Sequence, residues 1–232
     1  MFLFSILNNG ADFAELILYI LALLLAAMIA IVMHEMAHGY MALKCGDPTA
    51  KNAGRLTFNP LAHFDLIGVI MLLLVGFGWA KPVPVNPSNF KNYRKGTFLV
   101  SVAGVATNLI LCGIGLLLIY ILKPLILYTA TATVTAVALR KLLYYFLVFF
   151  TKINFMLAFF NLLPIFPLDG FRVVNLLLKP GNAYSQFMYR YGSFALIGLI
   201  LLSRVLNMVN LQFLDIFYWG NYLIGRLLGL VM

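Results

Sequence analysis

The residues best suited to chemistry are His34, Glu35 and His38, which form an H-E-x-x-H motif. On a helix, histidines four residues apart lie on one face, so both imidazoles can bind one metal ion. Zinc is the metal that this motif typically holds, and the glutamate beside it can act as the general base toward a zinc-activated water. Three ionisable groups at the end of an apolar run are costly unless a cation compensates them. The sequence therefore predicts one zinc ion per chain rather than a plain amphipathic helix end.

A catalytic zinc usually takes three protein ligands and keeps one position open. The only other glutamate, Glu15, precedes the motif, so the third ligand cannot be a downstream glutamate. We favour Asp169, because it follows two prolines at the end of a long apolar run, although an Asp-Gly turn is the alternative. His63 and Asp65 flank the apolar segment at 66–80, and they are expected to cap a helix or to lie in a solvated loop rather than to bind the metal. The full set of remaining candidates is His63, Asp47, Asp65, Asp169 and Asp215.

Two asparagines are candidate substrate or oxyanion residues. Asn161 lies eight residues before Asp169, on the same helical face as Asn154. Its amide could hold the scissile carbonyl, or it could satisfy backbone carbonyls freed by the prolines that follow. These two alternatives are equally balanced. For Asn108, inside another apolar run, hydrogen bonding between helices is favoured over contact with substrate.

The composition sets the environment in which these residues must work. Of 232 residues, 63% are apolar and only 10% are charged, which excludes a soluble enzyme and a disordered chain. A membrane span needs about 20 apolar residues, so the chain has room for four to six. The net charge is +9, but the basic residues lie in loops between apolar runs. This placement is typical of membrane orientation rather than of nucleic-acid binding.

We therefore expect an all-α polytopic membrane protein with five to six transmembrane helices. A single domain is expected over residues 1–232, with a catalytic core at about 13–175 and C-terminal helices at about 184–232. Residues 66–80 are too short to span and contain three glycines, so they are expected to be re-entrant. A small β-like insertion is expected where residues 55–59 alternate and where residues 82–85 read Pro-Val-Pro-Val. Plain structural pairing of these strands is favoured over an edge that binds an extended peptide. The candidate spans are residues 16–33, 97–122, 142–168 and 186–202, with a milder run at 125–139 and an interrupted tail from 205.

The distribution of charge predicts the orientation of the chain. Residues 44–96 hold seven of the sixteen basic residues, whereas the segment before the first run has two acids and no base. The positive-inside rule then places the N-terminus outside and residues 44–63 and 81–96 in the cytoplasm. If neither residues 66–80 nor 125–139 cross, Asp169 comes to the same side as His34 and His38. The active site is therefore expected near the cytoplasmic side.

Two segments resemble the signatures of the site-2 protease family of intramembrane zinc metalloproteases. Residues 33–39 carry the H-E-x-x-H motif, and residues 161–170 match N-x-x-P-x-x-x-L-D-G at every fixed position. Residues 104–108 resemble the family's G-P-x-x-N element, with Val105 where proline is usual. Residues 46–60 and 79–85 resemble the compact prokaryotic branch without PDZ or CBS domains. The resemblance implies zinc ligands His34, His38 and Asp169, with Glu35 as the catalytic base.

The expected function is hydrolysis of peptide bonds within or near transmembrane segments. Its expected partners are membrane-protein substrates and the lipid bilayer, with no nucleic acid, and its expected location is a prokaryotic cell membrane. The alternative is a zinc transporter or a non-catalytic zinc scaffold. A transporter would need further ionisable groups across the membrane, and apart from Lys152 the central runs lack them.

Overall fold

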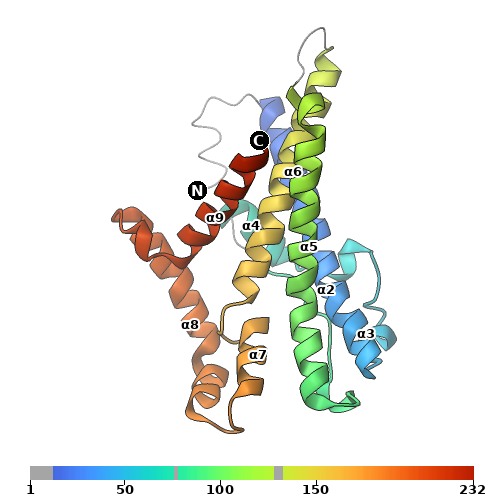
Figure 1. Ribbon diagram of the computed structural model, residues 1–232, viewed down its shortest axis with the longest axis vertical. Helices are drawn as coiled ribbons and strands as arrows, with labels where there is room; N and C mark the ends of the chain where they lie inside the picture. Colours follow the sequence, from blue (N-terminus) through green and yellow to red (C-terminus); the bar gives the residue numbers. More distant parts are fainter. Residues whose placement is uncertain (1–12, 76–77, 128–132) are drawn as a thin grey trace.

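The structure is a computed structural model that describes residues 13–75, 78–127 and 133–232 (Figure 1). Within that part of the chain, four helices are long and apolar enough to cross a membrane. They are α2 (Phe13–Cys45), α5 (Tyr93–Leu127), α6 (Val134–Asn161) and α8 (Ala183–Met208). The shorter elements are α3 (Thr49–Asn52), α4 (Leu66–Val75), α7 (Asp169–Leu177), α9 (Ile216–Val231) and the 3-10 turns η1 (Pro60–Ala62), η2 (Pro87–Asn89) and η3 (Gln212–Leu214). This architecture confirms the predicted all-α membrane protein.

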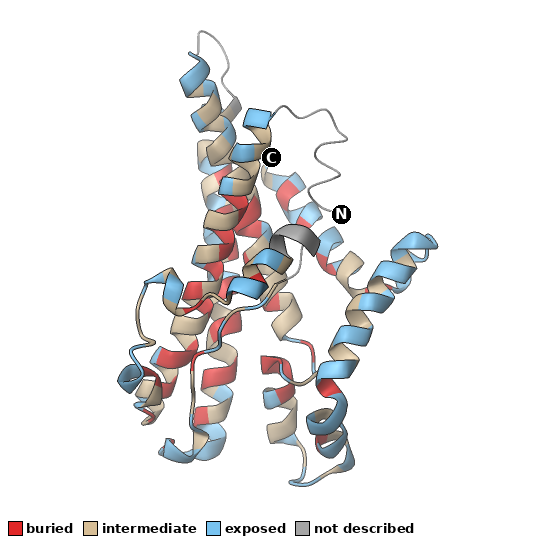
Figure 2. Ribbon diagram, turned by 180° about the vertical axis from the view of Figure 1, so that it is seen from behind, coloured by how far each residue is buried: buried red, intermediate tan, exposed pale blue. Residues whose placement is uncertain are grey.

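Helices α2, α5 and α6 pack against one another and form the core of the molecule. On α2 the contact face consists of alanines, and Ala22, Ala26 and Ala30 are fully buried. Small residues let neighbouring helix backbones approach closely, which favours packing in a membrane. Phe149 and Phe150 of α6 are buried against this face. Figure 2 shows the buried residues gathered along these three helices, where the helices face one another.

The run at 125–139 does not cross as one helix, because it is shared between α5 and α6. Helix α5 ends at Leu127 and α6 begins at Val134, so the run is divided between the ends of two antiparallel helices. Thr133 caps α6 by accepting a hydrogen bond from the N–H of Ala136. At its other end α6 stops at Asn161, earlier than the predicted residue 168, because Pro164 cannot continue a helix. Residues 162–168 form the turn that leads into α7.

The segment predicted to be re-entrant begins and ends on the same side of the molecule. Its helix α4 has 10 residues, which is about 15 Å and only half of a hydrocarbon core about 30 Å thick. Phe64 and Ala80 form an isolated antiparallel bridge, and the N–H of Lys81 donates to the carbonyl of His63 at 2.8 Å. A β-carbon at Gly68 would overlap the carbonyl oxygen of Trp79. The returning chain therefore requires a glycine at that point.

The predicted β-like insertion is wrong in the part of the chain that the structure describes. Neither residues 55–59 nor residues 82–85 form a strand, and the Phe64–Ala80 pair is an isolated bridge. The prolines at 82 and 84 have no N–H to donate to a ladder. The guanidinium of Arg55 instead donates to the carbonyl of Lys81 at 2.6 Å, so a side chain takes the place of strand pairing.

Helix α8 lies outside the three-helix core, whereas α9 packs on α5 and α6 through its buried residues Ile224 and Leu228. Helix α8 leans away from the core, and most of its residues are exposed (Figures 1 and 2). The buried carboxylate of Asp215 accepts hydrogen bonds from Ser203 and Asn207 of α8 and from the N–H of Phe217 in α9, which joins the two helices. Helix α9 has 16 residues, about 24 Å. The predicted count of five to six spans would require α9 to cross, and it stays a prediction.

Candidate metal centre

Three potential metal ligands from distant parts of the chain meet in the structure. His34 and His38 are buried on α2, and Asp169 is the buried first residue of α7. Their ligand atoms lie within 4.8 Å of one another. The two Nε2 atoms are 2.9 Å apart, and the Oδ2 atom of Asp169 is 3.5 Å from Nε2 of His34 and 3.1 Å from Nε2 of His38. The residues that the sequence singled out are thus brought together.

The outer nitrogens of both imidazoles are occupied by hydrogen-bond acceptors. The Nδ1 atom of His34 lies 2.5 Å from Oδ1 of Asn108, and the Nδ1 atom of His38 lies 2.7 Å from the carbonyl oxygen of Val100. A carbonyl oxygen can only accept, so each Nδ1 must carry the proton. In a neutral imidazole the other nitrogen is then bare. Both Nε2 atoms therefore point lone pairs at each other and at Asp169.

This arrangement fits a zinc ion. Three electron-pair donors converge with no hydrogen among them, and Oδ2 of Asp169 is buried without a hydrogen-bond partner. Zinc bonds of 2.0–2.1 Å at tetrahedral angles separate neighbouring ligand atoms by roughly 3.3 Å, and the three observed separations bracket this value. Metal-bound histidines typically donate their other N–H to a carbonyl or an acid, as both do here. The donor set and its spacing thus suit a catalytic zinc site.

One face of α5 forms the wall behind the two histidines. Val100, Gly104 and Asn108 are spaced four residues apart, so they lie on the same face. A β-carbon at Gly104 would lie 2.5 Å from Cε1 of His34 and 2.5 Å from Nε2 of His38. Only glycine leaves room for both rings. The four-residue spacing of Gly104 and Asn108 is a signal in the sequence that they share one face of α5, but it does not show that this face meets the histidines.

Asn108 is a buried neighbour of His34 and has no face open to a substrate. Its side chain is fully buried, and its Nδ2 donates to Oδ1 of Asn154 at 2.7 Å and to the carbonyl of Ala30 at 3.3 Å. Asn154 is also fully buried and donates to the carbonyl of Phe150 at 2.8 Å. A substrate contact of Asn108, the less favoured alternative, does not suit this geometry, because all of its polar atoms face protein, whereas hydrogen bonding between helices does. It orients a candidate ligand instead.

Asn161 is the last residue of α6 and is half-buried. Its Nδ2 donates to the carbonyl of Leu157, one turn earlier in the same helix, at 3.0 Å. This bond supports the interpretation in which Asn161 satisfies backbone near the prolines. A role toward substrate stays a prediction.

Glu35 is held by a segment that is distant in sequence. The backbone N–H of Val83 donates to Oε2 of Glu35 at 2.8 Å. Val83 is buried between prolines, and its side chain packs near Gly39 one turn beyond the glutamate. Sequence reasoning missed Val83, since every residue except proline offers a backbone N–H and its type carries no signal. The segment thus fixes one oxygen of the candidate base.

The other candidate ligands have structural partners elsewhere. His63 is fully buried and is the C-cap of η1, so it caps, which is one of the two expected alternatives, and it is not solvated. Its Nε2 donates to the carbonyl of Thr57 at 2.8 Å. Asp65 accepts from the N–H of Gly68 at 2.9 Å and so caps α4. Asp215 joins α8 to α9. Among the described residues, Asp169 is the acid that completes a group with the two histidines.

Asp47 lies beyond the end of α2 and organises the loop that carries Val83. Its fully buried carboxylate accepts hydrogen bonds from Thr49, Asn89 and the N–H of Asn86. Burial raises the pKa of Asp47, but the hydrogen bonds from Thr49, Asn89 and Asn86 outweigh it and hold the pKa below its ordinary value. Asp47 is thus a charged anchor for residues 86–89.

Comparison with known sequences assigns the chain to a family. The profile of peptidase family M50 matches residues 22–203, which include all of the candidate ligands except Asp215. The chain belongs to peptidase family M50. It is also 44% identical over 159 residues to a Bacillus subtilis (strain 168) protein named "Putative zinc metalloprotease YwhC", a match that covers 68% of this chain and 70% of that protein. No solved structure matches the chain.

Membership of family M50 confirms the predicted enzyme class and cofactor. The M50 chain is a membrane-embedded zinc metalloprotease, and its apolar helices account for the predicted membrane environment. The alternative of a zinc transporter or non-catalytic scaffold is not favoured.

Proposed function

We propose that His34, His38 and Asp169 hold the zinc ion and that Glu35 is the catalytic base. The observation that carries this proposal is the convergence of two bare Nε2 atoms and an unpartnered Oδ2 atom from α2 and α7. When bound, zinc supplies the Lewis acidity that activates water and polarises the scissile carbonyl. Glu35 is half-buried next to His34 in the chain, so its carboxylate belongs to the same turn of α2.

The residues of the protein would perform the proton transfers and orient the zinc ligands. Glu35 accepts a proton from the attacking water and later passes it to the leaving amine. The N–H of Val83 holds Oε2 of Glu35, which leaves Oε1 to exchange the proton. Asn108 and the carbonyl of Val100 keep the two imidazoles in one tautomer and one orientation.

We further propose that the substrates are transmembrane segments, cleaved near the cytoplasmic side of a prokaryotic cell membrane. Two features support this. The two histidines lie within α2, a helix apolar enough to span, and basic residues gather in the loops that follow it. A scissile carbonyl inside a helix is hydrogen-bonded, so the substrate must unwind locally. Lipid cannot form hydrogen bonds with the backbone groups that unwinding frees. A polar site of the protein at the membrane edge can form them.

The test compares Glu35→Gln with His34→Ala in purified protein. Glu35→Gln removes the base and keeps every ligand, so it should retain one zinc per chain and lose proteolysis of a transmembrane test substrate. His34→Ala should lose zinc as well. Metal content by elemental analysis separates the two cases. Substantial proteolysis by Glu35→Gln would exclude Glu35 as the base, and full zinc in His34→Ala would exclude the ligand set.

A further inference from the structure

Arg55 links the segment that holds Glu35 to the helical part of the molecule. Its guanidinium donates to the carbonyl of Lys81 at 2.6 Å, and a charged donor makes this a strong type of hydrogen bond. Lys81 lies two residues before Val83, whose N–H donates to Oε2 of Glu35 at 2.8 Å. Arg55 therefore holds the backbone just before the group that fixes the candidate base.

The link between Lys81 and Val83 is stiff. Two residues of extended chain cover only about 7 Å, and the residue between them is Pro82, whose ring fixes its φ angle. Pro84 follows Val83, and a residue that precedes proline is restricted to extended conformations. A displacement of the Lys81 carbonyl would therefore move the N–H of Val83, because the backbone between them has little freedom to absorb it.

Arg55 is itself anchored to α2 through α3. Its backbone N–H donates to the carbonyl of Ala50 at 2.9 Å, and Ala50 is fully buried. A β-carbon at Gly39 of α2 would lie 3.2 Å from the methyl group of Ala50 and 3.0 Å from a methyl group of Val83. Gly39 lies one turn beyond Glu35. Arg55 and Val83 are thus both held against the part of α2 that carries the candidate base.

The second hydrogen bond of Lys81 leads to a loop. Its N–H donates to the carbonyl of His63 at 2.8 Å, and Nε2 of His63 donates to the carbonyl of Thr57 at 2.8 Å. Both partners belong to the connection between α3 and α4, in which the side chains of Phe58 and Leu61 are exposed. The His63 bond therefore joins the segment to another loop, whereas the Arg55 bond joins it to the helices.

We propose that Arg55 is a positioning residue for the reaction and that it keeps the N–H of Val83 on Oε2 of Glu35. The consequence for catalysis rests on the proposed role of Glu35 as the base. Without the Arg55 bond, the N–H of Val83 would shift, and Oε1 of Glu35 would no longer be aimed at the attacking water. The two histidines would keep their orientation, since partners on α5 hold both rings.

Hydrogen exchange at the amide of Val83 in the purified protein tests the contact. Pro82 and Pro84 have no N–H, so residues 82–84 contribute a single exchangeable amide, which mass spectrometry with electron-transfer fragmentation resolves. Arg55→Met removes every donor and should speed this exchange about five-fold, the effect of one net hydrogen bond. Arg55→Lys keeps a charged donor and should exchange as the wild type does. Unchanged exchange in Arg55→Met would overturn the proposal.

The consequence for catalysis is measured on the same variants with a transmembrane test substrate. Arg55→Met should retain one zinc per chain and lower kcat about ten- to hundred-fold, as a misplaced catalytic group does, with KM little changed. Arg55→Lys should restore most of kcat. If Arg55→Met lost its zinc through misfolding, Arg55→Gln would take its place, since its shorter side chain cannot reach the carbonyl.

The two proposals fail in different ways. Full kcat in Arg55→Met, despite faster exchange at Val83, would overturn the positioning role and leave Glu35 as the base. Proteolysis by Glu35→Gln, together with faster exchange in Arg55→Met, would instead refute the proposed base while the Arg55 contact would stand.

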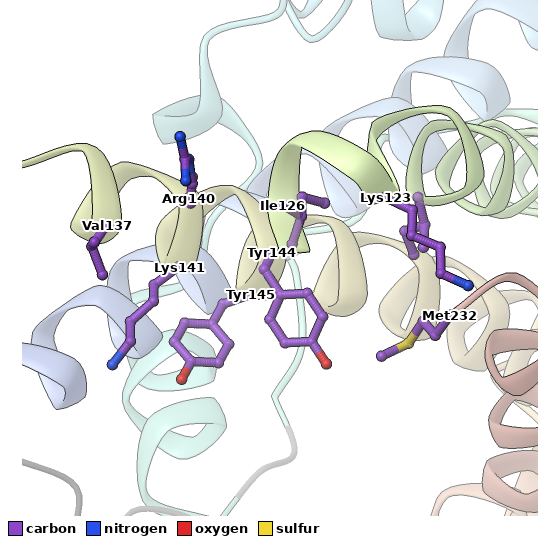
Figure 3. Close-up of a pocket in the computed structure, with 9 residues that line it drawn as sticks. Lys123, Ile126, Val137, Arg140, Lys141, Tyr144, Tyr145 and Met232 are labelled. Carbon is purple, nitrogen blue, oxygen red and sulfur yellow. The ribbon is translucent and has the colours of Figure 1, made fainter. Parts of the chain in front are cut away.

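Two variants that remove a lysine serve as controls. Lys51→Met takes an exposed cation from α3, four residues before Arg55. Lys123→Met takes one from the wall of a cavity of about 340 Å³ near the end of α5 (Figure 3), nineteen residues beyond Gly104 and thus about 28 Å along the helix. Neither should change kcat or the exchange at Val83. Equal acceleration by Lys51→Met would show that the exchange responds to charge rather than to the donated hydrogen bond, and it would overturn the proposal.

Discussion

The Nδ1 atom of His34 lies 2.5 Å from the Oδ1 atom of Asn108, and both side chains are buried. The amide of Asn108 cannot rotate freely, because its Nδ2 is bound to Asn154 and to the carbonyl of Ala30. Its oxygen is therefore fixed toward the imidazole. A chain of two buried amides from α5 and α6 thus sets the tautomer of a residue on α2.

Substituting Asn108→Ala should weaken zinc binding while leaving all three proposed ligands in place. Loss of such an outer partner typically costs 10–100-fold in metal affinity or activity, so we expect a reduction of about that size. Competition with a chromophoric chelator measures the affinity directly. Asn161→Ala is the control, since its amide donates to its own helix, and it should bind zinc as the wild type does. Equal zinc affinity in Asn108→Ala and wild type would show that the amide chain does not orient His34.

Gly104→Ala tests the close approach of α5 to the two histidines. The added methyl group would lie 2.5 Å from atoms of both rings, and overpacking of this kind costs about 1–3 kcal/mol. We expect reduced zinc affinity and reduced proteolysis. Gly113→Ala is a matched control in the same helix, because nothing lies within 4 Å of its new β-carbon. That variant should keep its zinc and gain up to about 1 kcal/mol in helix stability. Identical behaviour of the two variants would contradict the proposed contact.

Asp47 should make the stability of the protein sensitive to acid. Its pKa is lowered in the folded state, so the folded state favours the charged carboxylate. That contribution to the free energy of unfolding is complete above the unfolded pKa of about 3.9, and it is lost as pH falls through the lower folded value. Asp47→Asn should be less stable at pH 7 by about 1–3 kcal/mol and should lose less stability between pH 5 and pH 3. Denaturant unfolding in detergent at several pH values measures both effects. If the free energies of unfolding of the wild type and of Asp47→Asn fell in parallel as the pH decreased, Asp47 would not be the source of the acid sensitivity.

Lys51 and Lys91 should face the same compartment. Both are exposed, and the N–H of Lys91 donates to the carbonyl of Cys45 at the end of α2. Single cysteines at the two positions, in a background lacking Cys45 and Cys112, should react with a membrane-impermeant maleimide only from the cytoplasmic side. Labelling from opposite sides would mean that residues 66–80 cross the membrane. Labelling of both from outside would reverse the proposed orientation.

Substrates with weak helices should be cleaved faster. Glycine and proline destabilise a helix interior by about 1 and 3 kcal/mol relative to alanine, so they lower the cost of unwinding near the scissile bond. Replacing them by leucine or alanine in a test substrate should slow cleavage without abolishing binding. The two substrates are compared by their initial cleavage rates at concentrations that occupy the same fraction of the enzyme. Equal rates for both substrates would contradict a requirement for unwinding and leave the proposed metal site untouched.

The sequence predicted the features that depend on residue type and chain length. The histidines were recognisable by their spacing, and Asp169 by elimination and by its prolines. The return of the chain after α4 to the Phe64–Ala80 bridge was predictable because residues 66–80 are too short to span, and entry into the membrane stays a prediction. The end of α6 was placed seven residues too late, since apolar character continues beyond Asn161 although the helix does not.

Features that depend on backbone groups or on tertiary contacts were not predicted. The N–H of Val83 and the carbonyl of Val100 contact the candidate site, but neither depends on the side chain that the sequence specifies. The expected strands failed because Arg55 binds the carbonyl of Lys81 in place of a ladder. The partner of Asn108, a substrate or a histidine, depends on which face α5 turns toward α2, and this tertiary contact could not be predicted from the sequence.

The contact between α2 and α7 also affects the conformational entropy of the unfolded chain. In the proposed site a metal joins His38 to Asp169, and all of α5 and α6 lies between them. The ion therefore acts as a reversible cross-link that closes a long loop and removes conformational entropy from the unfolded chain. Helix α7 has only 9 residues, too few to be stable alone. Chelation would thus loosen the path from α6 into α8 as well as stop the chemistry.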